Sequence, residues 1–189
     1  MKKVLILGAG GNIARRVIDQ LAGQTDVQLT LLARSARRLG KTPPNARVIE
    51  GSVLDYPQLQ AAVAGQDIVY ANLAGELGPM ARNIVRAMED AGVQRLIFIS
   101  SIEIYREPVK AVLRPYRAAD AIEVSDLAYT VLRPAWFTAA NEVDFELTRK
   151  GEPERGTVLS QRSLATFIVQ LIEKPEQYQR ESLGINKPE

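Results

Sequence analysis

Short apolar runs alternate along the chain with longer segments in which apolar residues recur every three or four positions. The short runs have the length and composition of buried strands, and the longer segments have the periodicity of helices with one apolar face. We place six strands at residues 4–7, 27–33, 46–50, 67–73, 95–101 and 128–132. Because strands alternate with helices, the pattern predicts an α/β domain with a doubly wound parallel sheet.

The segments between the strands supply the helices and their ends. In the first helix, Ile13, Val17 and Leu21 share one face. A second helix follows Asp55, whose carboxylate can cap its first turn. We expect further helices at residues 78–92, 118–124 and 161–173, a short strand at 157–159 and an edge strand at 182–185.

Three glycines stand directly after the first strand, in the sequence GAGG at residues 8–11, and the first helix follows at once. Strand, glycine turn and helix are the parts of a dinucleotide site, where glycines permit a tight turn and a close approach of backbone to the pyrophosphate. The helix N-terminus offers the phosphates unpaired N–H groups and a positive dipole end. We therefore expect cofactor contacts from Gly8, Gly10, Gly11, Asn12 and Ile13. An ordinary glycine-rich turn is the alternative interpretation.

The spacing of these glycines departs from the common fingerprint. The pattern G-x-G-x-x-G fits only at Gly8 and Gly10, because its last position falls on Ile13. The spacing that fits the chain is Gly8-x-x-Gly11-x-x-Ala14.

The end of the second strand carries Arg34, with Arg37 and Arg38 shortly after it. A site for NAD(H) usually places an acidic residue there to bind the ribose 2′-hydroxyl. A guanidinium instead pairs well with a 2′-phosphate. Arg34 therefore favours NADP(H) as the cofactor, the alternative being a solvated basic turn before a helix.

The chain has 189 residues, a formal net charge of +2, and neither cysteine nor histidine. This length predicts one domain over residues 1–189, without a separate substrate domain. The balanced charge gives no sign of nucleic-acid binding. The missing residue types exclude thiolate and imidazole metal sites and nucleophiles activated by histidine. Since the first apolar run is too short for a signal peptide or a membrane span, we expect a cytoplasmic protein.

Three motifs carry a resemblance to a known family: GAGGNIA at residues 8–14, ISSIEIY at 99–105 and YTVLRPAWF at 129–137. They resemble the atypical short-chain dehydrogenase/reductase family, in its NmrA-like and biliverdin reductase B-like group. The resemblance extends from Val4 to about Pro175. It implies a Rossmann-like sheet in one domain that binds NADP(H).

Two further segments gain a role from this resemblance. The segment around Asp55 is similar to a family stretch whose aspartate approaches the adenine, although capping the helix suffices to explain this residue. The sequence NLAG at residues 72–75 resembles a motif beside the ribose and pyrophosphate, which implies cofactor contacts from Leu73, Ala74 and Gly75. The alternative for Asn72 is a purely structural one, in which it ties strand ends together.

The fifth strand ends in two hydroxyl side chains, Ser100 and Ser101. Open α/β sheets bind ligands beyond the carboxyl ends of their strands, which makes Ser100 a candidate cofactor contact. By its distance from Tyr105, Ser101 matches the family's serine that holds the reacting carbonyl. Capping of the strand end is the alternative for both serines.

The family's Tyr-x-x-x-Lys pair is not present in this chain. Tyr116 is followed four residues later by Asp120, and a carboxylate there disfavours the ionised tyrosine. Tyr105 is followed at the same distance by Val109. The absence of this pair disfavours dehydrogenation of simple alcohols, and we expect Tyr116 to donate a hydrogen bond to the substrate or to line its pocket.

The sixth strand runs into the sequence RPAWF at residues 133–137, which the resemblance places over the nicotinamide. Pro134 and Ala135 are thereby implied as cofactor contacts. For Trp136 and Phe137 two interpretations stay open: the wall of a pocket for a planar substrate, or the apolar core.

Two functions follow. The first is an NADPH-dependent reductase in which Ser101 and Tyr116 hydrogen-bond a small-molecule acceptor such as a flavin or a quinone, while the proton comes from water. The second is a non-catalytic NADP(H) sensor that signals through a protein partner. A sugar-nucleotide epimerase is disfavoured, because the lysine and the usual substrate domain are missing.

Overall fold

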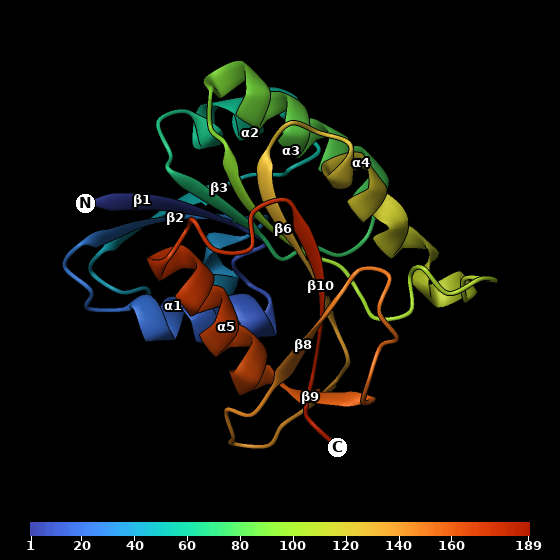
Figure 1. Cartoon of the computed structure of the whole chain (residues 1–189). Coiled ribbons are helices and arrows are strands. Elements are labelled where there is room, and N and C mark those ends of the chain that lie inside the picture. The colour runs from blue at the N-terminus through green and yellow to red at the C-terminus, as the bar shows by residue number, and fades with distance from the viewer.

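A mostly parallel sheet runs through the molecule and is covered by helices on both faces, in a computed structural model that describes all 189 residues (Figure 1). The order of its eight strands is β3-β2-β1-β4-β5-β6-β10-β8. Their bounds are β1 Lys2–Leu7, β2 Val27–Ala33, β3 Ala46–Glu50, β4 Ile68–Ala71, β5 Arg95–Ile99, β6 Ala128–Pro134, β8 Glu146–Arg149 and β10 Glu181–Asn186. This is the doubly wound Rossmann-like order, so the predicted fold class is confirmed.

The helices form one layer on each face of the sheet. Helices α1 (Asn12–Leu21) and α5 (Gln161–Glu173) pack together on one face, and α2 (Tyr56–Val63), α3 (Leu77–Ala91) and α4 (Ala119–Glu123) lie on the other (Figure 1). The 3-10 helix η1 (Ala36–Leu39) follows β2, and a second 3-10 helix, η2 (Ala111–Ala118), directly precedes α4. None of these helices combines the length and the apolar composition needed to span a membrane.

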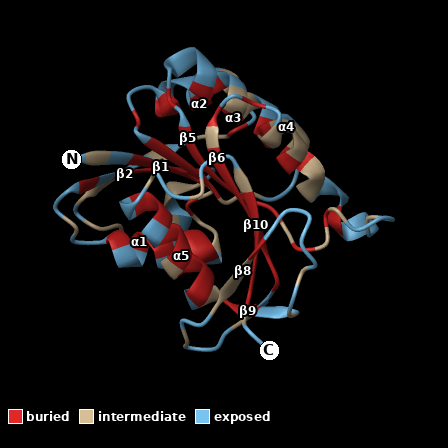
Figure 2. Ribbon diagram, viewed as in Figure 1, coloured by how far each residue is buried: buried red, intermediate tan, exposed pale blue.

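The continuous apolar run of β1 is explained by this layering. Val4 and Ile6 belong to the apolar cluster under α1 and α5, whereas Leu5 and Leu7 belong to the cluster under α2 and α3. Successive side chains of a strand point to opposite faces, and both faces of this sheet are covered. Burial is accordingly concentrated in the central strands and in the sides of the helices that face them (Figure 2).

The carboxyl-terminal part of the sheet differs from the prediction. The strand expected at the edge, β10, lies inside the sheet, parallel to β6 on one side and antiparallel to β8 on the other. A Cβ on Gly184 of β10 would lie 2.4 Å from the Thr148 hydroxyl of β8, so glycine permits the two strands to pair closely. The edge position was wrong because β8, in a charged segment, was not recognised as a strand.

Candidate functional site

The glycine turn is held against two neighbouring strands. The N–H groups of Gly8 and Ala9 both donate to the carbonyl of Leu32 in β2, at 3.1 and 3.2 Å. Gly8 has a φ of 75°, and a Cβ there would lie 2.0 Å from the carbonyl oxygen of Asn72. Only glycine fits this position, both for its backbone conformation and for its contact with the segment after β4.

Gly10 and Gly11 serve different purposes. A Cβ on Gly11 would lie 2.3 Å from Nδ2 of Asn72, so this glycine makes room for the Asn72 side chain. A Cβ on Gly10 would meet only the Leu39 side chain, at 3.9 Å. Gly10 therefore leaves open the space in front of the turn, where a ligand can approach the backbone.

Helix α1 begins directly after the turn without any capping side chain. Gly11 is its N-cap residue, and the first turn contains no acidic residue. The first N–H groups of an α-helix have no acceptor within the helix, so those of Asn12 and Ile13 are available to an anion. The Ile13 side chain is buried in the core, which leaves its backbone as the part that can contact a ligand.

A cavity of about 650 Å³ opens in front of this turn, at the carboxyl ends of β1, β2 and β4. Arg15, Arg34 and Arg38 line it together with the glycines, and no acidic residue does. None of these three guanidinium groups takes part in an ion pair. Three unneutralised cations beside a helix N-terminus suit a ligand with several phosphates.

Two acidic residues share a hollow with Arg34, and each carboxylate accepts a hydrogen bond from the backbone. Glu50 and Asp55 line a neighbouring hollow of about 400 Å³ that Arg34 also lines. The Glu50 carboxylate accepts the N–H of Ala36 at 2.9 Å, which holds the start of η1. The Asp55 carboxylate accepts the N–H of Gln58 at 3.1 Å, so its predicted capping of α2 is observed, while its contact with adenine stays a prediction.

The segment after β4 forms another wall of the cavity. Leu73 and Ala74 line it, as does Asn72, in agreement with the expected position of this segment. Gly75 is not among the lining residues; its carbonyl accepts the N–H of Leu77 at 2.8 Å as α3 begins. Contacts of all these residues with a cofactor stay predictions.

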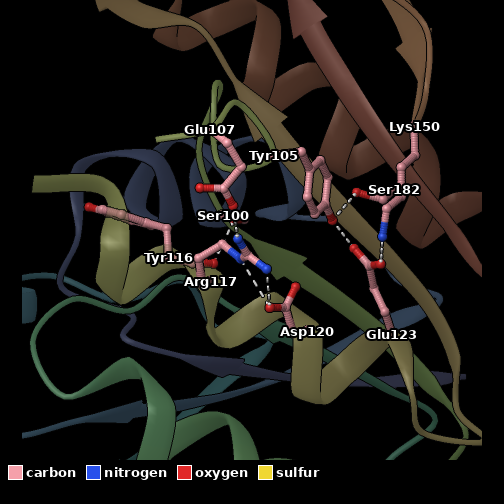
Figure 3. Close-up of polar contacts among 9 residues, drawn as sticks. All are labelled: Ser100, Tyr105, Glu107, Tyr116, Arg117, Asp120, Glu123, Lys150 and Ser182. Carbon is pink, nitrogen blue, oxygen red and sulfur yellow. Dashed lines mark hydrogen bonds and ion pairs between the residues drawn. The ribbon is translucent and has the colours of Figure 1, made fainter. Parts of the chain in front are cut away.

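The two serines after β5 have different surroundings. Ser100 is buried, and its hydroxyl donates to the carbonyl of Tyr116 at 3.0 Å, which ties the strand end to η2 (Figure 3). Ser101 is only partly buried, and its hydroxyl makes no hydrogen bond within the chain. Of the two, Ser101 has the hydroxyl that is free to bind a ligand.

Asp120 is engaged with arginine rather than with Tyr116. Its carboxylate forms an ion pair with Arg117 at 3.0 Å, and Arg117 also pairs with Glu107 at 3.1 Å. The Tyr116 ring points away from this group (Figure 3). The carboxylate in the place of the family's lysine is thus balanced by a neighbouring cation.

Tyr105, the other tyrosine of this region, belongs to a partly buried polar group. Its hydroxyl donates to the carboxylate of Glu123, which also forms an ion pair with Lys150, and lies 3.2 Å from the Ser182 hydroxyl (Figure 3). Burial and the bond to Glu123 raise the pKa of Tyr105 above its ordinary value. This tyrosine therefore stays protonated at neutral pH.

The segment after β6 separates into buried and exposed halves. Pro134 and Ala135 are buried, and their backbone groups bond to Ile102 and Ile185. Trp136 and Phe137, in the short strand β7 (Trp136–Thr138), are 52% and 46% exposed. The interpretation of these two aromatic residues as core residues is therefore wrong, because β7 pairs only with the short strand β9 (Val158–Ser160) outside the main sheet.

Comparison with known proteins agrees with this geometry. The pattern of a protein family described as NAD(P)H-binding matches residues 8–175. The chain belongs to this family. A Rossmann-fold NAD(P)-binding protein from Shigella flexneri is 48% identical, with a TM-score of 0.93 over 100% of this chain and 94% of the other. A short-chain dehydrogenase/reductase from Veillonella parvula, solved in complex with NADP, is 25% identical, with a TM-score of 0.87 over 99% and 95%.

A reductase matches a shorter part of this NAD(P)H-binding protein. It is a (4-alkanoyl-5-oxo-2,5-dihydrofuran-3-yl)methyl phosphate reductase from Streptomyces griseus, 26% identical over 136 residues. The match covers 71% of this chain but only 48% of that reductase.

Several residues that line the cavity were not among the predicted contacts of this NAD(P)H-binding protein. Arg15 is the clearest: it stands four residues after Gly11, so helical spacing places it on the same face of α1 as the glycine turn. Its guanidinium donates to the carbonyl of Arg38, which joins α1 to η1. The others come from β2 and the segment after it, the segment after β3, and α3: Leu32, Ala33, Ser35, Arg38, Gly51, Ser52, Val53 and Met80.

Proposed function

We propose that the protein is an NADPH-dependent oxidoreductase that transfers hydride to a small, planar acceptor such as a flavin or a quinone. The observation that carries this proposal is the cavity in front of the glycine turn, lined by three arginines that form no ion pair and by no acidic residue. In such enzymes the cofactor supplies the hydride chemistry, and the protein binds and orients the two reactants.

The arginines support NADPH over NADH. Arg34 stands at the end of β2, where an acidic residue would bind the 2′-hydroxyl of NADH. Arg15 and Arg38 line the same cavity, so two further guanidinium groups favour a 2′-phosphate there. The NADP bound to the Veillonella parvula relative is consistent with this preference.

The surroundings of Ser101 support a reductase over a simple binding protein. The unbonded Ser101 hydroxyl lies at the carboxyl end of β5, and the exposed ring of Trp136 follows the neighbouring strand β6. We assign Ser101 and Tyr116 the task of hydrogen-bonding the acceptor, with the proton supplied by water. An acceptor that needs no strong acid, such as a flavin or a quinone, suits this arrangement better than a simple ketone.

The direct test is NADPH oxidation against a panel of flavins, quinones and dicarbonyls. With an accepted substrate, Ser101→Ala should lower kcat/KM about tenfold through lost orientation, the scale of one hydrogen bond, while NADPH affinity is unchanged. Tight NADPH binding without turnover of any acceptor would contradict the proposal. That result would instead favour a redox sensor of the NmrA-like type, which acts through a protein partner.

The pH dependence of the reaction gives a second prediction. No histidine is present, and burial and the bond to Glu123 raise the pKa of Tyr105, so neither a histidine nor this tyrosine supplies an acid that titrates near neutrality. The rate should therefore be nearly flat between about pH 6 and 8, and Tyr116→Phe should cost less than the roughly hundredfold that marks a proton donor. Initial rates across this pH range test both points. A bell-shaped profile with a limb that disappears in Tyr116→Phe would show that the tyrosine is an activated acid.

A further inference from the structure

A buried arginine lies at the carboxyl end of β6 and is joined to the loop between β8 and β9. The side chain of Arg133 is 2% exposed, and its guanidinium forms an ion pair with Glu154 of that loop. It also donates from Nε to the Ser182 hydroxyl, at 3.1 Å. A charge buried this deeply is tolerated only when it is paired, so Arg133 fixes the position of Glu154.

The second carboxylate oxygen of Glu154 binds the segment that follows Ser101. It accepts the backbone N–H of Glu103 at 2.9 Å, while the first oxygen is taken by Arg133. Glu103 has a φ of 64°, in the left-handed region that non-glycine residues seldom adopt. The bond that Glu154 accepts thus helps to hold the backbone in this conformation.

Ser101 lies between two backbone bonds to β6, and the bond from Glu103 to Glu154 follows two residues later. The N–H of Ser100 donates to the carbonyl of Leu132 at 2.7 Å, and that of Ile102 donates to Pro134 at 3.1 Å. Residues 100–102 therefore run beside the end of β6, and Glu154 holds the next residue. Both attachments lead back to the strand that carries Arg133.

We propose that Glu154, held by Arg133, is a positioning residue that fixes the turn at 101–103 and thereby orients the Ser101 hydroxyl toward the acceptor. This inference rests on the proposed reductase function. Glu154 itself touches neither reactant; its effect on the reaction passes through the backbone of Glu103.

Glu154→Gln tests the attachment, because an amide has one acceptor oxygen where the carboxylate has two. Arg133 and the Glu103 N–H bond different oxygens of the carboxylate, so in this variant one of them faces the amide NH2 group, which accepts no hydrogen bond. Hydrogen exchange at the Glu103 amide should therefore become at least roughly tenfold faster. Glu152→Gln is the matched control, since Glu152 is exposed on the same loop and its carboxylate accepts only the Arg149 N–H, at 2.7 Å. Unchanged exchange in Glu154→Gln would overturn the proposal, whether or not the protein is a reductase.

The link to Ser101 is tested by a double-mutant cycle. Glu154→Gln should lower kcat/KM about fivefold in the parent protein but have almost no effect when Ser101 is already alanine, because both substitutions act on the same hydrogen bond from Ser101 to the acceptor. NADPH affinity should stay the same in every variant. Equal losses in both backgrounds would show that Glu154 has only a general structural role. If the parent oxidises no NADPH with any acceptor, the reductase proposal fails, and with it the assigned orientation of an acceptor.

A rescue variant guards against simple misfolding. Glu154→Gln alone leaves the Arg133 charge buried without a partner, which destabilises the fold. Combining it with Arg133→Met removes that charge and frees the amide oxygen of the introduced glutamine for the Glu103 N–H. We expect protection of the Glu103 amide to return in the double variant. Protection that stays lost in a folded double variant would contradict the assigned role of Glu154.

Discussion

Replacing Gly10 with valine should abolish NADPH binding while the fold stays intact. A Cβ at this position meets only the Leu39 side chain, at 3.9 Å, so the valine occupies the open space in front of the turn. The pyrophosphate could then no longer reach the N–H groups of Asn12 and Ile13. Loss of two charge-assisted hydrogen bonds at about 1.5–3 kcal/mol each predicts a dissociation constant at least roughly a hundredfold higher.

Calorimetric titration with NADPH checks this prediction, together with thermal unfolding of the same variant. The contrasting variant is Gly11→Val, whose side chain would collide with Asn72, 2.3 Å from the Cβ position. It should lose both stability and binding, whereas Gly10→Val should lose binding alone. Normal NADPH affinity in Gly10→Val would show that the cofactor does not approach this turn.

The sequence was sufficient to predict most of the sheet and to bring the glycine turn and Arg34 to one edge of it. Hydrophobic periodicity is a local property, and it located the six strands that give the order β3-β2-β1-β4-β5-β6. The glycine turn and Arg34 are brought together because the carboxyl ends of neighbouring parallel strands meet at one edge. Strand ends were less accurate: β5 stops at Ile99, two residues before the predicted end.

Features that depend on contacts between distant segments could not be predicted from the sequence. The different purposes of Gly10 and Gly11 depend on Asn72, which reaches the turn from another strand. The sequence predicts that the carboxylate of Asp120 acts on Tyr116, but in the structure this carboxylate forms an ion pair with Arg117. In each case the role of a residue depends on which side chain the fold places beside it, and the spacing of residues along the chain does not determine this.

The two serines show the same limit within the candidate site. Ser100 and Ser101 are adjacent and chemically identical, so spacing to Tyr105 was the only guide to their roles. In the structure the Ser100 hydroxyl donates a hydrogen bond to the carbonyl of Tyr116, while the Ser101 hydroxyl forms no hydrogen bond within the chain. The attachment of Glu154 beside Ser101 also joins segments that no motif connects.

Arg34→Ala should weaken NADPH binding strongly and leave NADH binding nearly unchanged. Arg34 lines both the main cavity and the neighbouring hollow and has no carboxylate partner, so its charge is available to the 2′-phosphate. A lost charge-assisted hydrogen bond costs about 1.5–3 kcal/mol, which corresponds to a roughly 10- to 150-fold higher dissociation constant. NADH lacks the phosphate and has nothing to lose at this position.

Titration of both cofactors into the same preparations measures the effect. Arg37→Ala is the matched control, because Arg37 is exposed three residues away but does not line the cavity. It changes the net charge by the same amount and should alter neither affinity by more than about twofold, the scale of a screened surface charge. Equal weakening of NADPH and NADH in Arg34→Ala would place the arginine at the pyrophosphate rather than at the 2′-phosphate. Tighter binding of NADH than of NADPH to the parent protein would remove the basis for assigning Arg34 to a 2′-phosphate at all.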